Sequence, residues 1–174
     1  MLTERLKNTI KDYPDFPKKG IVFKDLTPVL LDPELFNDLI VCMSENTIFR
    51  ETDALVGIDA RGFIFSSAIA QIVKKPLILA RKKNKLPGKL IEKEYGLEYG
   101  NDSLGIQRSS ISGLDKFVIV DDLLATGGTA QCIYDLLTSQ EKKVIGMSVV
   151  VELSFLRAID RLKFNVYPIL KFLK

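Results

Sequence analysis

Short apolar runs alternate with helical segments along most of this chain, and that alternation restricts the fold more than any other feature. The runs with the length and composition of buried strands are 54–58, 77–80, 117–120, 144–151 and 166–170. The segments with helical patterning between them are 62–74, 128–139 and 155–162. Repeated strand–helix–strand order predicts an α/β fold, with a mostly parallel twisted sheet and helices on both faces. Ligands of such sheets bind beyond the carboxyl ends of the strands, so functional residues are expected there.

The N-terminal part of the chain lacks this alternation. Residues 2–12 carry Leu2, Leu6 and Ile10 at a spacing of four, which predicts a short amphipathic helix. Two prolines and a glycine in residues 13–20 rule out regular helix there.

A second helix and one long irregular segment complete the outline. Asp32 followed by Pro33 predicts a helix start, and that helix should run to about Asn46. Residues 81–105 are charged, contain four glycines and show no steady period, so they are interpreted as a long loop that could include a hairpin. Because no linker or repeat divides the chain, we expect a single domain over 1–174.

Composition restricts the class of protein. Hydrophobic residues make up 47% and charged residues 27% of the 174 residues, as in a globular domain. No apolar run is long enough to span a bilayer, and the first residues lack the apolar core of a signal peptide, so a cytoplasmic protein without a membrane partner is expected. The net charge of +3 suits a small anionic substrate and is too weak to predict a nucleic-acid partner.

The absence of histidine limits the available chemistry. It excludes Ser-His and Cys-His nucleophiles, so any general acid or base must be a carboxylate, Lys, Tyr or Cys. The cysteines, Cys42 and Cys132, lie among apolar residues and are interpreted as reduced core thiols. Two cysteines without histidine predict no zinc site.

The most informative stretch is VIVDDLLATGGTA, residues 118–130. An apolar strand ends in Asp121 and Asp122, which face opposite ways but can both accept hydrogen bonds from a polyol near the strand end. In the turn that follows, glycines let the backbone approach a ligand, and the amides and helix start favour an anion such as phosphate. The residues of this predicted phosphate site are Ala125, Thr126, Gly127, Gly128 and Thr129. A diol acceptor beside a phosphate site predicts binding of a ribose 5-phosphate. Neither a P-loop lysine nor a dinucleotide fingerprint is present.

Two further strand ends carry charge. Asp59, Ala60 and Arg61 stand where the strand 54–58 turns into a helix, and an arginine there can bind phosphate oxygens with its planar fork of donors. Five basic residues occur in 79–89; taken alone, they could equally be a solvated charge run or a weak nucleic-acid patch.

The residues of these motifs, and their order along the chain, resemble those of a known family. The stretch 118–130 resembles the phosphoribosyl pyrophosphate (PRPP) signature of type I phosphoribosyltransferases, and DDLLATGGT is especially similar to the adenine phosphoribosyltransferases. GIDARGF at 57–63 resembles the pyrophosphate loop of that family, and LEYG at 97–100 its catalytic-loop segment. Residues 21–28 resemble its base-binding hood. The resemblance extends from about Phe16 to Leu153.

The resemblance implies roles for these residues. Asp121 and Asp122 would bind the ribose hydroxyls, and residues 125–129 the 5-phosphate. Pyrophosphate would be bound by Asp59, Ala60, Arg61, Arg81, Lys82 and Lys85. Glu98, with Tyr99 beside it, would handle the proton at the base, and the residues contacting adenine would be Val22, Phe23 and Lys24.

The implied reaction joins adenine to PRPP, giving AMP and pyrophosphate in purine salvage. The resemblance also implies Mg²⁺ held mainly by substrate rather than by protein ligands, a homodimer, a hood over residues 1–32 and a mobile catalytic loop over 81–105. Three positions depart from the family pattern: Lys24, Gly105 and Gln107. Two alternatives stay open, a phosphoribosyltransferase for another nucleobase and a non-catalytic PRPP-sensing regulator.

Overall fold

The computed structural model describes the backbone of residues 1–82, 84–97 and 100–174, and the side chains of these residues except 95–97 and 100–102. The chain divides into two compact units, Met1–Cys42 and Met43–Lys174. The predicted hood, residues 1–32, lies inside the first unit. Among the described residues, no helix is both long and apolar enough to cross a bilayer.

The N-terminal unit combines short helices with a small hairpin. Its elements are α1 (Leu2–Thr9), β1 (Lys11–Pro14), β2 (Val22–Asp25), the 3₁₀ helix η1 (Thr27–Leu31) and most of α2 (Pro33–Ser44). Strands β1 and β2 pair in antiparallel fashion. The predicted cap is present, because the Asp32 carboxylate accepts a hydrogen bond from the Leu35 amide at 3.0 Å. The first helix ends at Thr9, earlier than predicted, since the chain becomes extended at Ile10 to enter the hairpin.

The larger unit is built on a mixed sheet. Its strands are β3 (Ala54–Ile58), β4 (Leu77–Lys82), β5 (Leu90–Leu97), β6 (Gly100–Gln107), β7 (Lys116–Leu124), β8 (Lys143–Leu153) and β9 (Val166–Phe172). Within the described residues the strand order is β5-β6-β4-β3-β7-β8-β9. The block from β4 through β3, β7 and β8 to β9 is parallel, whereas β5 and β6 are antiparallel additions at one edge. This confirms the predicted mostly parallel sheet.

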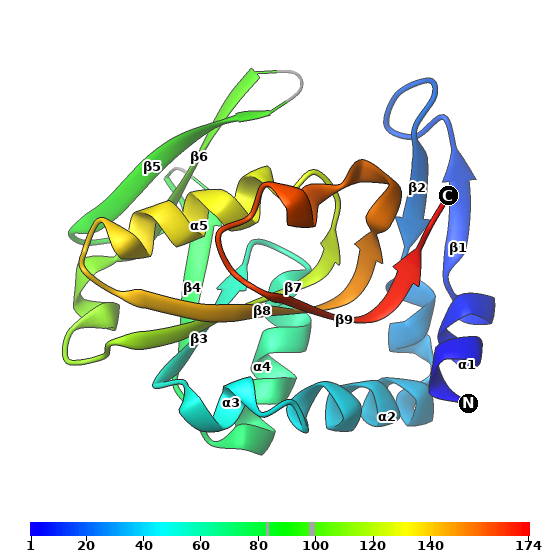
Figure 1. Ribbon diagram of the computed structural model, residues 1–174, viewed down its shortest axis with the longest axis horizontal. Helices are drawn as coiled ribbons and strands as arrows, with labels where there is room; N and C mark the ends of the chain where they lie inside the picture. Colours follow the sequence, from blue (N-terminus) through cyan, green and yellow to red (C-terminus); the bar gives the residue numbers. More distant parts are fainter. Residues whose placement is uncertain (83, 98–99) are drawn as a thin grey trace. The chain divides into compact units, whose positions relative to one another are not determined.

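Helices cover both faces of this sheet, as predicted. Figure 1 shows α4 (Gly62–Val73) on one face and α5 (Gly128–Thr138) on the other. The short α3 (Ile48–Glu51) precedes β3. Strand β3 is buried along its whole length because it lies between β4 and β7 under the helices. The core between α5 and the sheet includes Ile119, Ile133, Leu136, Leu137 and Met147.

One predicted helix needs correction, and one predicted loop is more regular than expected. Residues 155–162 were expected to form a helix, but they form only two 3₁₀ turns, η3 (Ser154–Leu156) and η4 (Ala158–Asp160), because Arg157 between them adopts a left-handed conformation with φ of 53°. Residues 81–105 were expected to form a long loop that could include a hairpin, and a hairpin is present: β5 (Leu90–Leu97) and β6 (Gly100–Gln107) pair in antiparallel fashion. The glycines that obscured the period lie within or beside these strands.

Candidate active site

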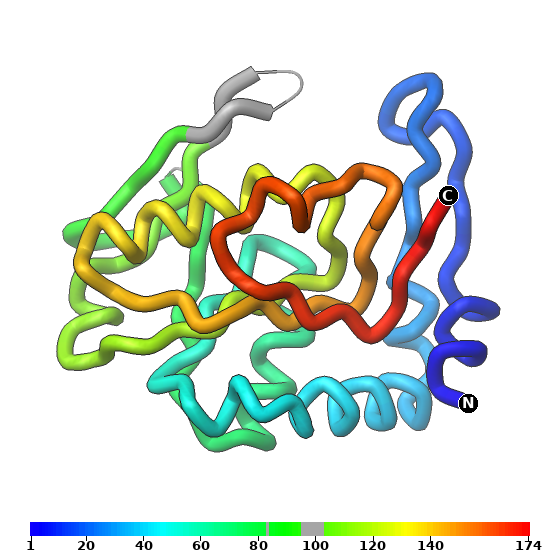
Figure 2. The backbone as a smooth tube through the Cα atoms, in the orientation of Figure 1, coloured from blue at the N-terminus to red at the C-terminus, as the bar shows by residue number. Residues whose placement is uncertain are grey.

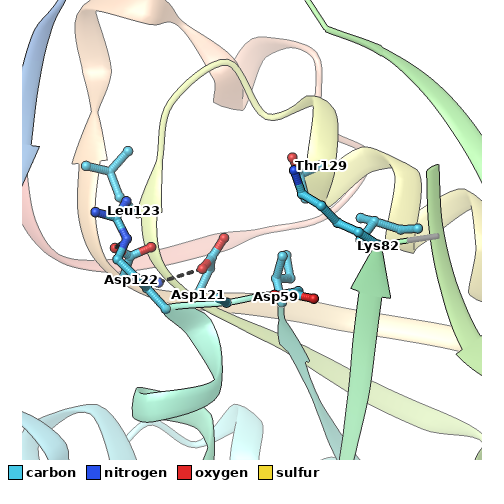
Figure 3. Close-up of a pocket in the computed structure, with 10 residues that line it drawn as sticks. Asp59, Lys82, Asp121, Asp122, Leu123 and Thr129 are labelled. Carbon is cyan, nitrogen blue, oxygen red and sulfur yellow. Dashed lines mark hydrogen bonds and ion pairs between the residues drawn. The ribbon is translucent and has the colours of Figure 1, made fainter. Parts of the chain in front are cut away.

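Strand β7 ends in the two carboxylates that the sequence singled out. Asp122 is buried and Asp121 half-buried, and the Asp122 amide donates a hydrogen bond to Asp121 Oδ1 at 2.9 Å. Figure 3 shows Asp121 pointing into the space between the end of β7 and Thr129 at the start of α5. Because neighbouring strand residues face opposite ways, the two carboxylates approach the pocket from different sides of the strand.

Burial dominates the electrostatics of this pair. It raises the pKa of Asp121 well above the ordinary aspartate value, and the adjacent charge of Asp122 raises it further. Burial also raises the pKa of Asp122, while the nearby Arg61 guanidinium opposes that rise. Arg61 Nε lies 2.7 Å from Asp122 Oδ2. The cation therefore makes ionisation of both carboxyl groups less unfavourable, and an ionised carboxylate accepts hydrogen bonds from hydroxyl groups.

The turn after β7 forms a small concave site at the start of α5. Gly127 is the residue before the helix and adopts φ of 83°, a left-handed conformation that glycine takes without steric cost. A cavity of about 90 Å³ lies at this turn. The predicted phosphate-binding residues all line it: Ala125, Thr126, Gly127, Gly128 and Thr129. Backbone amides at the N-terminus of an eleven-residue helix favour an anion there.

The second strand end lies beside the first. Residues Asp59 to Arg61 connect β3 to α4, and the Asp59–Ala60 peptide bond is cis. Gly62 opens the helix, directly against β7: a Cβ at this position would lie 2.7 Å from Asp121 Oδ1 and 3.0 Å from the Val120 carbonyl oxygen. Only glycine therefore allows α4 to start this close to the ribose-binding carboxylate predicted at Asp121.

The third strand end brings basic residues to the same edge of the sheet. Arg81 Nε donates to Asp59 Oδ2 at 3.1 Å, and its Nη1 donates to the carbonyl oxygen of Lys85 at 3.3 Å. The guanidinium also lies 5.7 Å from the centre of the Phe63 ring. Lys82, one residue on, is exposed at the end of β4. Arg81 is thus fixed by three neighbours, while Lys82 and Lys85 are exposed.

These strand ends enclose one polar cavity of about 500 Å³. Its described lining consists of Ile58, Asp59, Ala60, Arg61, Lys82, Leu104, Asp121, Asp122, Leu123 and Thr129. The lining mixes acidic and basic side chains, and Figure 3 shows Asp59, Asp121 and Lys82 around the same space. Among the described residues, no three His, Cys, Asp or Glu side chains come together to hold a metal ion.

Some predicted site residues are not tested by this geometry. Glu98 and Tyr99 lie outside the described residues. Val22, Phe23 and Lys24 belong to the N-terminal unit, where the Phe23 ring packs edge-on against Phe16 with centroids 5.3 Å apart. Lys24 Nζ donates to Asp12 Oδ2 at 2.7 Å across the β1–β2 hairpin.

Sequence reasoning missed several residues near the site, among them Leu104 and Arg161; Ile58 and Leu123 also line the main cavity. Leu104 of β6 lines the main cavity, because β6 pairs with β4 next to the strand end. Arg161, from the segment after β8, donates to the Thr126 carbonyl oxygen at 3.2 Å. The pairing of β6 could not be read from a glycine-rich stretch, and nothing in the sequence singles out Arg161 among the chain's basic residues.

Comparison with known proteins agrees with this geometry. The profile of the phosphoribosyl transferase domain matches residues 34–163. An adenine phosphoribosyltransferase from Prochlorococcus marinus strain MIT 9215 is 51% identical over 172 residues, covering 99% of this chain and all of that protein.

Solved structures give the same result. The adenine phosphoribosyltransferase of Thermoanaerobacter pseudethanolicus superposes with a TM-score of 0.93 at 40% identity, covering 99% of this chain and 100% of that one. The enzyme of Saccharomyces cerevisiae, solved with adenine and an imino-altritol bisphosphate, has a TM-score of 0.88 at 33% identity, covering 96% and 97% of the two chains. The carboxylate pair, the turn of residues 125–129 and the basic strand ends thus lie at one edge of a sheet that matches these enzymes. The chain belongs to the phosphoribosyltransferase family, among its adenine phosphoribosyltransferases.

Proposed function

We propose that this protein transfers the phosphoribosyl group of PRPP to adenine, giving AMP and pyrophosphate in purine salvage. The observation that carries the proposal is the junction of the Asp121–Asp122 pair with the phosphate-site turn, residues 125–129, beside a cavity lined by basic groups. A substrate that carries a sugar 5-phosphate and loses a diphosphate in the reaction needs these three features together. The relatives named above act on, or were solved with, adenine.

The ribose is positioned by carboxylates and the 5-phosphate by the turn. Ionised Asp121 and Asp122 accept hydrogen bonds from the two ribose hydroxyls, while the amides of residues 125–129 and the Thr129 hydroxyl bind the phosphate. Fixing the sugar at both ends leaves its anomeric carbon oriented for attack by a ring nitrogen of adenine. The carboxylates also lie near the ring, where positive charge develops as the bond to pyrophosphate breaks.

Negative charge develops on the leaving pyrophosphate, and basic residues in and beside the cavity stabilise it. Arg61, Arg81, Lys82 and Lys85 supply donors from two neighbouring strand ends. A guanidinium has five N–H donors, enough to serve a carboxylate and a phosphate at the same time. Mg²⁺ would be held mainly by the substrate, because it prefers phosphate oxygens and water as ligands. When bound, it supplies further positive charge to the diphosphate.

The residues proposed to bind the base and handle its proton are not tested by the geometry of the cavity. Glu98, with Tyr99 beside it, handles the proton at the purine imidazole in this proposal, and the 81–105 segment excludes water. Val22, Phe23 and Lys24 form the adenine site. A homodimer, in which loop residues could serve the partner's site, and a cytoplasmic location complete the proposal.

A substrate panel tests the proposal. Purified protein is incubated with PRPP, Mg²⁺ and, in turn, adenine, hypoxanthine, guanine, xanthine or orotate, and nucleotide formation is followed by chromatography. We expect AMP from adenine and no product from the other bases. Product with another base instead of adenine refutes the base assignment, and no product with any base favours the PRPP-sensing regulator.

A matched pair of variants ties the activity to the cavity. Asp121→Asn, at the carboxyl end of β7, should abolish most activity. Asp115→Asn makes the same change just before the other end of the strand, where the carboxylate is exposed and pairs with Lys142 at 3.1 Å, and should leave activity intact. Equal effects of the two substitutions contradict the proposed site.

A further inference from the structure

The segment after β8 lies directly against the phosphate-site turn, although the two are some thirty residues apart in sequence. Arg161 Nη2 donates to the Thr126 carbonyl oxygen at 3.2 Å and to the Leu156 carbonyl oxygen at 3.1 Å. One nitrogen of the guanidinium thus joins the turn to η3. Figure 2 lets the reader follow both stretches of backbone in this region.

Apolar packing supports the same turn from the same segment. A Cβ on Gly127 would lie 3.2 Å from Ala158 Cβ and 3.4 Å from Leu162 Cδ2. The turn backbone is therefore in close contact with η4 and the residue that follows Arg161. Since Ala158 is buried, this contact belongs to the core and cannot relax freely.

The bond to Thr126 matters for anion binding because a carbonyl oxygen repels phosphate. An oxygen held by a guanidinium is turned toward that donor and away from an anion at the amides. The peptide that carries it is then fixed in the orientation that the neighbouring amides need. Arg161 also brings a positive charge to the outside of the turn.

We propose that Arg161 is a positioning residue for the 5-phosphate subsite: it fixes the Thr126 carbonyl so that the amides of the turn are preorganised for phosphate. This inference rests on the proposed function, because it assumes that residues 125–129 bind the 5-phosphate. It predicts a selective effect, on ligands that carry the sugar phosphate and not on pyrophosphate, which binds at the other strand ends.

The test compares two substitutions that remove the same charge from one short segment. Arg161→Gln removes the bond to the turn. Arg157→Gln is the control, since Arg157 pairs with exposed Asp160 at 2.7 Å and both side chains are largely exposed. For each protein, calorimetry gives the dissociation constants of ribose 5-phosphate and of Mg-pyrophosphate, and initial rates give KM for PRPP and kcat.

For Arg161→Gln we expect the dissociation constant of ribose 5-phosphate and KM for PRPP to rise about tenfold, equivalent to about 1.4 kcal/mol. Pyrophosphate affinity and kcat should change by less than about threefold, which is too small a free-energy change for the loss of a direct contact. Arg157→Gln should behave as the wild type. If the glutamine variant does not fold, Arg161→Lys, which keeps the charge without the planar fork, should show a smaller loss with the same selectivity.

Three outcomes overturn the role of Arg161. Equal losses of ribose 5-phosphate and pyrophosphate affinity indicate a general structural effect. Unchanged affinities show that the turn needs no support, and equal effects of the Arg157 and Arg161 substitutions show that net charge alone is responsible. A wild-type protein that forms no AMP refutes the proposed function itself, whereas active wild type with unaffected Arg161→Gln refutes only this inference.

Discussion

Replacing Gly62 with alanine should damage PRPP binding through a contact that can be measured in the structure. The added Cβ would lie 2.7 Å from Asp121 Oδ1, 3.0 Å from the Val120 carbonyl oxygen and 3.3 Å from Asp121 Cα. Two of these atoms belong to the β7 backbone and cannot rotate away. The Asp121 carboxylate must therefore move, or α4 must shift from the sheet.

The magnitude follows from two terms. Overpacking of this kind costs about 1–3 kcal/mol of stability. A displaced Asp121 also forfeits a hydrogen bond between a ribose hydroxyl and a charged acceptor, worth about 1.5–3 kcal/mol. On that basis kcat/KM for PRPP falls about ten- to a hundredfold. Because Gly62 is the first residue of α4, the helix propensity of alanine offsets little of this loss.

Gly57→Ala provides a control for stability alone. Its Cβ would clash with the Ser66 hydroxyl and lie 3.3 Å from Phe63 Cδ1, so it strains the packing of α4 on β3 without touching Asp121. Urea unfolding and initial-rate kinetics at a temperature where both variants are folded separate the two effects. If Gly62→Ala retains the wild-type kcat/KM for PRPP, or if Gly57→Ala loses as much, the argument from Asp121 is refuted.

Three further perturbations test other parts of the site. Asp121→Asn should abolish activity but raise the free energy of unfolding at pH 7, because the raised pKa of Asp121 means that ionisation is penalised in the folded state. This gain in stability should vanish as the pH falls to 3.8, where the carboxyl group is protonated in the unfolded state as well. Thermal melts at a series of pH values would measure it. Glu98→Gln should lower kcat more than it raises KM for PRPP; equal, small effects in steady-state kinetics exclude its proton role. Asp135→Ala removes the carboxylate that pairs with Lys93 at 3.3 Å and accepts a hydrogen bond from Gln131 at 2.7 Å. The contact between β5 and α5 should be destabilised by about 1 kcal/mol. Amide hydrogen exchange in the β5–β6 hairpin should therefore become faster relative to β8.

The centre of the parallel sheet could be predicted because β3, β7 and β8 are buried along most of their length. Residues 54–58 and 117–120 are continuous apolar runs, and helices that cover a sheet from both sides require such runs. The predicted starts of α4 and α5 were correct because glycine and the preceding polar turn mark them. The residues proposed to bind phosphate and ribose lie in the turn and strand end before α5, so they could be predicted together with the fold.

The antiparallel edge and the C-terminal segment were harder to predict for a physical reason. Strands β5 and β6 are rich in charged residues and glycine, so neither shows a clear apolar alternation, and only their mutual pairing and contact with β4 define them. Residues 155–162 have helical periodicity, but a left-handed Arg157 divides them into two turns. Contacts such as that of Arg161 with Thr126 depend on the tertiary fold and leave no local pattern.

The cavity described above contains its own counterions. Its described lining holds three aspartates and two basic residues, and Arg61 already contacts Asp122. Within this described lining, PRPP, a polyanion, therefore meets no excess of positive charge and must exchange an existing ion pair for its own contacts. Its association rate should accordingly depend only weakly on ionic strength.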